Sequence, residues 1–179
     1  MKVAARELVS SNGALDMATL AKKAGLSEGL AYHYFKNRAG VIAAVVDQYF
    51  DAFEEAVIDV AFAGDTWQER EKLRVEALVD FYCADPLTPV IYSRLGSEPE
   101  VVEVAGRRAR RQLELAARNI LMGQESGDIN ADRDPWILGA MMLGAINFVV
   151  SGYWQNGTDV EPKTLKKEIW AGIDALSRA

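Results

Sequence analysis

The sequence predicts an all-α fold of about nine helices, with a short three-helix domain at the N-terminus and a larger helical domain after it. Apolar residues recur at the 3.6-residue spacing of a helix in most segments of the chain. Only five of the 179 residues are proline, and runs of the β-branched residues that strands favour are few. No strand is therefore expected anywhere in the chain.

Capping residues divide the first third of the chain into four helices. Asp16, Ser27 and Asn37 each place a side-chain oxygen where it can accept from the first turn of a helix. Gly25 permits the left-handed backbone that ends a helix sharply. The helices expected from these signals span about residues 2–11, 17–24, 28–35 and 38–62. The fourth is long enough to link two domains, which we predict to be residues 1–45 and 46–179.

Proline and glycine mark the later helices in the same way. Pro99, Pro135 and Pro162 each stand where a first helical turn tolerates proline. The helices expected here span about residues 67–83, 90–95, 97–124 and 135–154, followed by one from residue 162. The last of these carries one apolar stripe, formed by Leu165, Ile169, Ile173 and Leu176.

The two short helices on either side of Gly25 predict a helix-turn-helix. Helices of eight residues are not stable alone and must cross tightly. Leu26 is expected to fill the angle between them. Leu20, Ala24, Phe35 and either Leu30 or Ala31 are expected to hold the second helix on the first. In such motifs the second helix enters the major groove of DNA, while cations and hydroxyls hold phosphates. The candidate DNA-binding residues are Ser27, Glu28, Gly29, Leu30, Tyr32, His33, Lys36 and Arg38.

The charge distribution favours binding of a polyanionic partner at the N-terminal end only. The net charge is −6, yet residues 1–50 hold six basic and four acidic residues, against 14 basic and 22 acidic residues in the remainder. Glu28 is the exception on the candidate helix. Its carboxylate could accept from a cytosine amino group or repel a phosphate, and its role stays open.

At these positions the chain resembles the tetracycline-repressor (TetR) family. The matching residues are Leu20-Ala21, Ala24-Gly25-Leu26-Ser27, Gly29, Tyr32-His33-Tyr34-Phe35 and Arg38, within about residues 4 to 50. The chain departs from the family's pattern at Asp16, Glu28 and Leu30. The resemblance implies a repressor that binds a palindromic operator as a homodimer, clamped by the last two helices of each subunit, and that a small molecule releases.

Two sets of C-terminal residues are candidates for a ligand site and for the dimer interface. The first set suits an apolar or aromatic ligand, although these residue types are equally typical of an ordinary hydrophobic core. The candidate ligand-binding residues are Trp67, Phe81, Tyr82, Tyr92, Met122, Trp136, Met141 and Asn147. The candidate interface residues are Met142, Ile146, Val149, Tyr153, Ile169, Trp170 and Ile173.

Other classes of protein are not expected. His33 is the single histidine, so a multi-histidine metal site is not expected, and no nucleophile-base pair or phosphate-binding loop predicts an enzyme or a cofactor. One cysteine and an N-terminus without a long apolar run predict a cytoplasmic protein. Residues 136–154 are apolar enough to resemble a membrane span, but their glycines, Asn147 and Ser151 favour a buried helix. The alternative function is a helical ligand- or protein-binding module with weak or no specific DNA binding.

Overall fold

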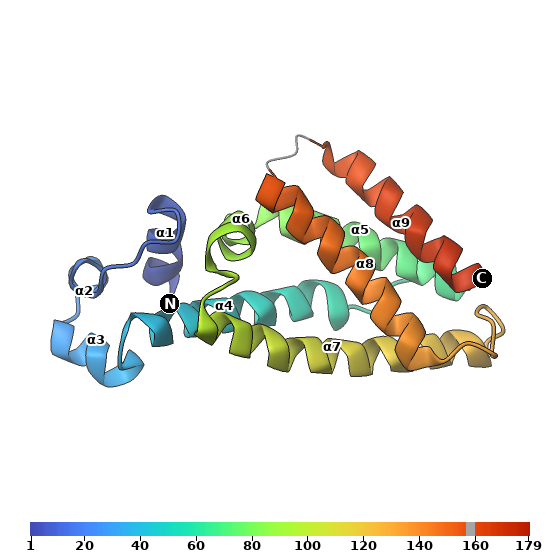
Figure 1. Cartoon of the computed structure of the whole chain (residues 1–179), viewed down its shortest axis with the longest axis horizontal. Helices are drawn as coiled ribbons and strands as arrows, with labels where there is room; N and C mark the ends of the chain where they lie inside the picture. Colours follow the sequence, from blue (N-terminus) through green and yellow to red (C-terminus); the bar gives the residue numbers. More distant parts are fainter. Residues whose placement is uncertain (157–159) are drawn as a thin grey trace. The chain divides into compact units, whose positions relative to one another are not determined.

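The computed structural model describes residues 1–156 and 160–179, and every regular element among them is helical, as predicted (Figure 1). These described residues form nine α-helices and two single turns of π-helix, which continue α4 and α6. In chain order the elements are α1 (Lys2–Ser10), α2 (Met17–Ala24), α3 (Glu28–Phe35), α4 (Arg38–Phe53), η1 (Glu54–Ile58), α5 (Trp67–Ala84), α6 (Leu87–Val90), η2 (Ile91–Leu95), α7 (Pro99–Glu125), α8 (Pro135–Asn156) and α9 (Pro162–Arg178).

The chain forms two compact units and passes between them three times. The N-terminal unit comprises Met1–Ala52 and Asp85–Arg107, and the C-terminal unit comprises Phe53–Ala84 and Arg108–Ala179. Sequence analysis assigned residues 85–107 to the C-terminal domain. In the structure this segment, which holds α6 and η2, packs with the N-terminal helices.

The predicted capping residues Asp16 and Ser27 cap α2 and α3 in the structure. Asp16 Oδ1 accepts from the amide of Thr19 at 2.8 Å, and Ser27 Oγ accepts from the amide of Leu30 at 3.2 Å. Gly25 ends α2 in the left-handed conformation, with φ 67° and ψ 28°. All three interactions lie within one turn of their own helix, so the local sequence is enough to specify them.

The expectation for Leu26 was wrong. Its side chain is 41% exposed, whereas Leu20, Ala21 and Ala31 are buried. Helices α2 and α3 contact one another, and each buries a small side chain, Ala21 in α2 and Ala31 in α3. Leu26 is left on the surface of the turn.

The segment of α6 and η2 supplies the rest of the N-terminal unit's core. Gly13 lies so close to it that a Cβ on this glycine would be 3.2 Å from Arg94 Cβ. The buried hydroxyls of Tyr49 and Thr88 are 2.9 Å apart, and burial raises the pKa of Tyr49.

The short helix predicted over residues 90–95 begins earlier, at Leu87. The long fourth helix ends at Ile58 rather than near residue 62, after its last turn widens into η1.

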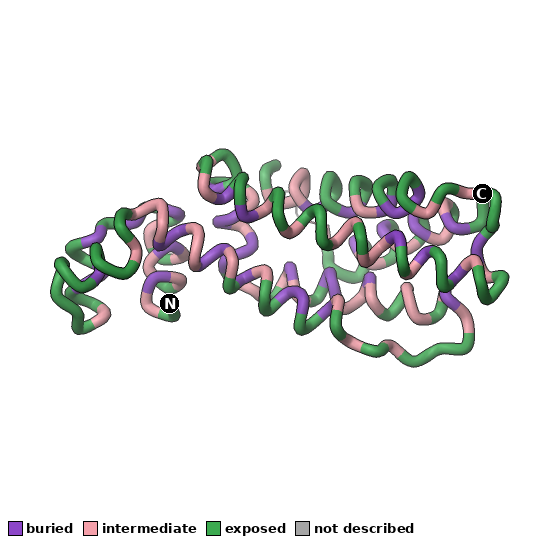
Figure 2. Tube along the Cα trace, turned by 90° about the horizontal axis from the view of Figure 1, so that it is seen from below, coloured by how far each residue is buried: buried purple, intermediate pink, exposed green. Residues whose placement is uncertain are grey.

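The C-terminal unit is built from the long helices. Helix α5 packs on η1 and α9, and α8 packs on α9. Asp128, in the loop after α7, accepts from the amide of Trp67 at 2.8 Å and so caps α5. Gly139 brings α8 against α7, since a Cβ there would lie 3.3 Å from Ala116 Cβ. Buried and exposed residues alternate along these helices at helical spacing (Figure 2).

Helix α8 is apolar on all sides. Among the described residues it alone is long and apolar enough to cross a membrane. A single such helix is weak evidence for a span, because core helices of soluble proteins pass the same test. Leu138, Met142, Ile146 and Val150 face the core of the C-terminal unit, and the opposite side of the helix is exposed.

We predict opposite effects of alanine at two glycines of α7. A Cβ on Gly123 would lie 2.9 Å from Cδ1 of the buried Trp67 ring and 2.7 Å from Ile129, so Gly123→Ala should lower the free energy of unfolding by about 1–3 kcal/mol. Nothing lies within 4 Å of a Cβ on Gly106, so Gly106→Ala should raise it by about 0.5–1 kcal/mol. Urea unfolding measures both, and equal stabilities would contradict the close approach at Gly123.

Candidate DNA-binding surface and ligand cavity

Helix α3 presents almost all of its side chains to solvent. Ala31 is its one buried residue, although the helix is only eight residues long. Seven of the eight candidate DNA-binding residues are exposed: Ser27, Glu28, Gly29, Leu30, Tyr32, His33 and Lys36. Sequence analysis did not include Tyr34, which is 71% exposed and lies edge-on to the His33 ring at 5.6 Å. These side chains are free to contact a partner.

Arg38, the eighth candidate, already has partners within the N-terminal unit. Its Nη1 lies 3.3 Å from Glu98 Oε1, and its Nη2 donates to the Gly13 carbonyl at 3.3 Å. The side chain is half-buried at the start of α4. Arg38 therefore links the start of α4 to Glu98 and to the Gly13 turn, and Lys36 is the exposed cation at the end of α3.

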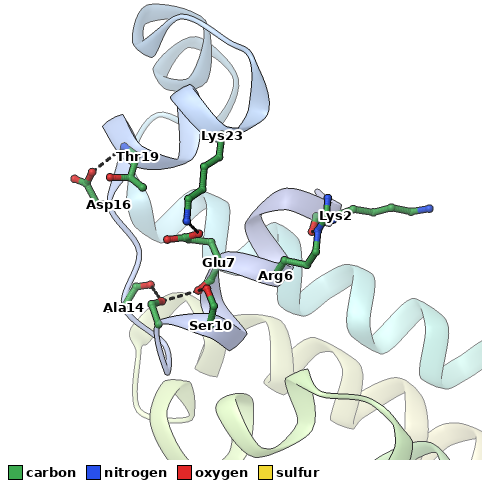
Figure 3. Close-up of polar contacts among 9 residues, drawn as sticks. Lys2, Arg6, Glu7, Ser10, Ala14, Asp16, Thr19 and Lys23 are labelled. Atoms are coloured by element: carbon green, nitrogen blue, oxygen red, sulfur yellow. Dashed lines mark hydrogen bonds and ion pairs between the residues drawn. The ribbon is translucent and has the colours of Figure 1, made fainter.

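The surface around α2 is polar and partly paired. Figure 3 shows Lys23 of α2 reaching Glu7 of α1, with which it forms an ion pair. The same view shows Asp16 beside Thr19, whose hydrogen bonds lower the pKa of the Asp16 carboxyl. Lys22 is exposed in the last turn of α2, next to the turn that leads into α3.

The C-terminal unit contains a cavity of about 350 Å³ between α5, α7, α8 and α9. Known small-molecule pockets begin at about this size and are mostly apolar. The apolar lining residues are Ile58, Trp67, Leu115, Ala116, Ile120, Met122, Gly139, Met142, Leu143, Ile146 and Ile173. The polar lining residues are Glu71, Arg74, Gln112, Arg118 and Asn119.

A polar cluster forms one side of this cavity. Glu71 Oε2 accepts from Asn119 Nδ2 at 2.9 Å and from Arg74 Nε at 3.1 Å. Arg74 Nη1 also donates to the carbonyls of Val57 and Ile58, at 2.9 and 3.2 Å. This cluster is not among the residues predicted from the sequence. Its one visible signal, an acidic and a basic residue three apart on a helix, is the usual pattern of a solvated surface pair.

One residue of the cavity wall, Trp67, carries a buried donor without an acceptor. Trp67 is 1% exposed, and its indole N–H has no hydrogen-bond partner among the residues that the structure describes. Most buried polar groups in proteins are paired.

The structure brings only some of the candidate ligand-binding residues together. Trp67 and Met122 line the cavity, and Tyr82 and Asn147 line a smaller neighbouring cavity of about 60 Å³ that shares Glu71 and Arg74 with it. The other candidates lie elsewhere: Phe81 packs edge-on to Phe53, Tyr92 belongs to the N-terminal unit, and Trp136 and Met141 are exposed. Residue type alone did not separate these two groups.

The candidate interface residues lie mostly inside the subunit. Met142, Ile146, Ile169 and Ile173 are buried in the core of the C-terminal unit. Tyr153 and Trp170 are half-buried, and Val149 is exposed. The exposed apolar side of α8, called the outer face here, consists of Ile137, Ala140, Met141, Gly144, Ala145, Phe148 and Val149. Phe148 is 82% exposed and Ile137 62% exposed, so this face has no partner within the described chain.

Comparison with known proteins identifies the N-terminal region. Residues 3–45 match the family model described as bacterial regulatory proteins, tetR family. The HTH-type transcriptional regulator BetI of Stenotrophomonas maltophilia is 45% identical over 65 residues, which are 36% of this chain and 31% of that relative. The match thus spans about a third of the relative's length.

Two solved structures share the fold over nearly the whole chain. The transcriptional regulator FadR of Bacillus subtilis, in complex with stearoyl-CoA, has a TM-score of 0.75 and 21% identity over 96% of this chain and 95% of that chain. FadR of Thermus thermophilus, a TetR family transcriptional repressor in complex with lauroyl-CoA, has a TM-score of 0.65 and 21% identity over 97% of this chain and 89% of that chain. At this identity they establish the fold.

We predict a pH-dependent cap on α2. The pKa of Asp16 is lowered below 3.8 by its hydrogen bonds to Thr19, so the carboxylate stabilises the folded state above that pH and stops doing so as the pH falls through the lowered pKa. Asp16→Ala should lower the melting temperature at neutral pH, and Asp16→Asn, which keeps a capping oxygen, should lower it less. Both differences from the wild type should shrink in acid. Melting curves recorded from neutral pH into acid measure both differences, and differences that stay the same size throughout would contradict the assignment.

Proposed function

Because the chain belongs to the TetR family through its N-terminal domain and has the fold of that family's regulators, we propose that it is a cytoplasmic transcriptional repressor. It binds a palindromic operator as a homodimer. When a small molecule binds in the cavity of the C-terminal unit, the protein is released from the operator. The observation that carries the proposal is α3, a capped helix with Ala31 as its one buried side chain. Because the other side chains of α3 are not buried within the unit, they are available to bind a partner.

The residues of α3 suit different parts of a DNA site. Glu28 and Gly29 lie in the first turn, the part of a recognition helix that reaches base edges, and Gly29 leaves room for close approach. Ser27 Oγ accepts from the helix, which leaves its O–H to donate to a phosphate. Tyr32, His33 and Lys36 are exposed donors for further phosphates. Arg38 contributes by positioning α4, through its bonds to Glu98 and Gly13.

The outer face of α8 is the proposed dimer contact. Its exposed Ile137 and Phe148 would be buried by a second copy, and Gly144 between them allows two helices to approach closely. A two-fold interface of this kind would present two copies of α3 to the two half-sites of a palindrome.

The cavity is the proposed effector site. The FadR proteins of Bacillus subtilis and Thermus thermophilus are complexed with stearoyl-CoA and lauroyl-CoA, ligands with long apolar chains. The cavity here is mainly apolar as well. Binding there releases the operator if the ligand-bound conformation has the lower affinity for DNA.

We predict that operator binding depends on Lys36 and Tyr32. Lys36→Ala should weaken binding about tenfold, by about 1.4 kcal/mol, and should make the dependence on salt shallower by about one unit of slope. Tyr32→Phe removes the phosphate-donating hydroxyl and should weaken binding less than Lys36→Ala does. Fluorescence anisotropy measures all of these on an operator found by selection from genomic fragments.

Lys163→Ala is the matched control, because Lys163 is an exposed lysine on α9. It should bind the operator like the wild type. If Lys36→Ala and Tyr32→Phe also bind like the wild type, or if selection enriches no inverted repeat, the chain is instead a binding module that has kept the fold without specific DNA binding.

We predict that Phe148→Glu prevents dimerisation. A charge placed at the centre of a two-fold apolar contact should weaken the dimer at least about 30-fold, the value expected for the loss of about 2 kcal/mol at a central aromatic. Sedimentation equilibrium at micromolar protein gives the mass. Leu73→Glu, at an exposed leucine of α5, should leave it unchanged. A wild-type protein that sediments as a monomer would rule out the interface.

A further inference from the structure

The half-buried charges on the cavity wall already neutralise one another. Glu71 Oε2 accepts from Arg74 Nε at 3.1 Å and from Asn119 Nδ2 at 2.9 Å. The same guanidinium donates through Nη1 to the carbonyls of Val57 and Ile58, at 2.9 and 3.2 Å. A charged ligand could bind Glu71 or Arg74 only by breaking this pair, which would leave the other charge without a partner.

The other polar groups of the wall offer no buried charge either. Gln112 is neutral, and Arg118 is exposed, so its guanidinium can stay in water. The indole N–H of Trp67 is buried, and the neighbouring ring atom Cδ1 would lie 2.9 Å from a Cβ on Gly123. Gly123 does not line the cavity, so this edge of the ring packs against α7 instead. The ligand charge that fits these walls is therefore zero.

The apolar walls and the volume limit the size of the ligand. Leu115, Ile120, Leu143 and Ile146 offer no hydrogen bonds to water or to a ligand. An apolar cavity of about 150 Å³ lined by such side chains stays dry and binds benzene. The cavity here has a volume of about 350 Å³. By this comparison it has room for a molecule of about two rings.

Three wall residues favour an aromatic ligand over a purely aliphatic one. Trp67, Met122 and Met142 all line the cavity. An indole ring can stack on another ring, and a methionine sulfur makes favourable contacts with a ring edge. Because methionine is flexible, the two thioethers can also adjust to a ligand that does not fill the space exactly as the empty cavity is shaped.

We propose that the effector is a compact, uncharged aromatic molecule of about two rings. The inference rests on the proposed function in one respect, that this cavity is the effector site. It adds the charge and the size of the ligand, which set it apart from the acyl-CoA ligands of the two FadR proteins.

A ketone and an acid of the same shape test the charge, and a thioester tests the size. The probes are 2-acetylnaphthalene, 2-naphthoate and lauroyl-CoA, titrated calorimetrically into the DNA-free protein at neutral pH. The ketone should bind at least tenfold more tightly than 2-naphthoate, and more tightly than lauroyl-CoA. No binding of the ketone, equal affinities for ketone and acid, or tighter binding of either charged probe would each overturn the proposal.

A variant that fills the cavity tests where the ketone binds. Leu115→Trp, on α7, adds a larger side chain to the wall and should weaken binding of 2-acetylnaphthalene at least tenfold. Leu121→Trp is the matched control, because Leu121 is an exposed leucine of the same helix that does not line the cavity, and it should leave the affinity unchanged. If both variants bind the ketone like the wild type, it binds outside the cavity and the proposal fails.

A second filling variant covers the case in which Leu115→Trp does not fold, which its circular dichroism spectrum would show. Leu143→Phe adds less volume, from α8, and should weaken the ketone in the same direction. Operator binding is measured separately from these titrations. A chain that binds the ketone in its cavity and binds no operator would support this ligand class and contradict the repressor function. A chain that binds an operator and does not bind the ketone would do the reverse.

Discussion

The left-handed turn at Gly25 is the constraint on which the candidate DNA-binding surface depends. With φ at 67°, Gly25 ends α2 and lets Ser27 begin α3 two residues later. A residue with a Cβ would adopt this conformation at a cost, and a longer connection would leave α3 free to move. Ala31 is the one buried residue of α3 and Phe35 is half-buried, so the other side chains of the helix stay available to a partner.

The loop after α7 has a comparable role in the C-terminal unit. Asp128 caps α5 at the amide of Trp67, and Gly123 allows α7 to lie against the same indole ring. Both interactions come from within six residues of each other in the chain. They hold the buried Trp67 ring in place beside the cavity, so a segment that the sequence presents as an ordinary polar loop helps to form the wall of the proposed effector site.

The two candidate sites differed in how well sequence could predict them. The α3 surface follows from one short helix whose register its own cap sets, so exposed positions could be read from spacing. Residues from four helices line the cavity, and whether a given residue lines it depends on how its helix is rotated about its axis. Trp67 and Met122 were predicted by residue type, but the same reasoning included the exposed Trp136 and omitted Arg74 and Asn119.

The sequence by itself determined the helices, their caps and the helix-turn-helix, because these depend on hydrogen bonds and apolar repeats within a few residues of one another. Tertiary structure alone decided which unit receives residues 85–107 and which side of α8 faces the core. Helix α8 is apolar all round, so its periodicity cannot distinguish Met142, which is buried, from Phe148, which is exposed. Only packing against α7 and α9 makes that choice, and with it decides which apolar side of α8 stays exposed.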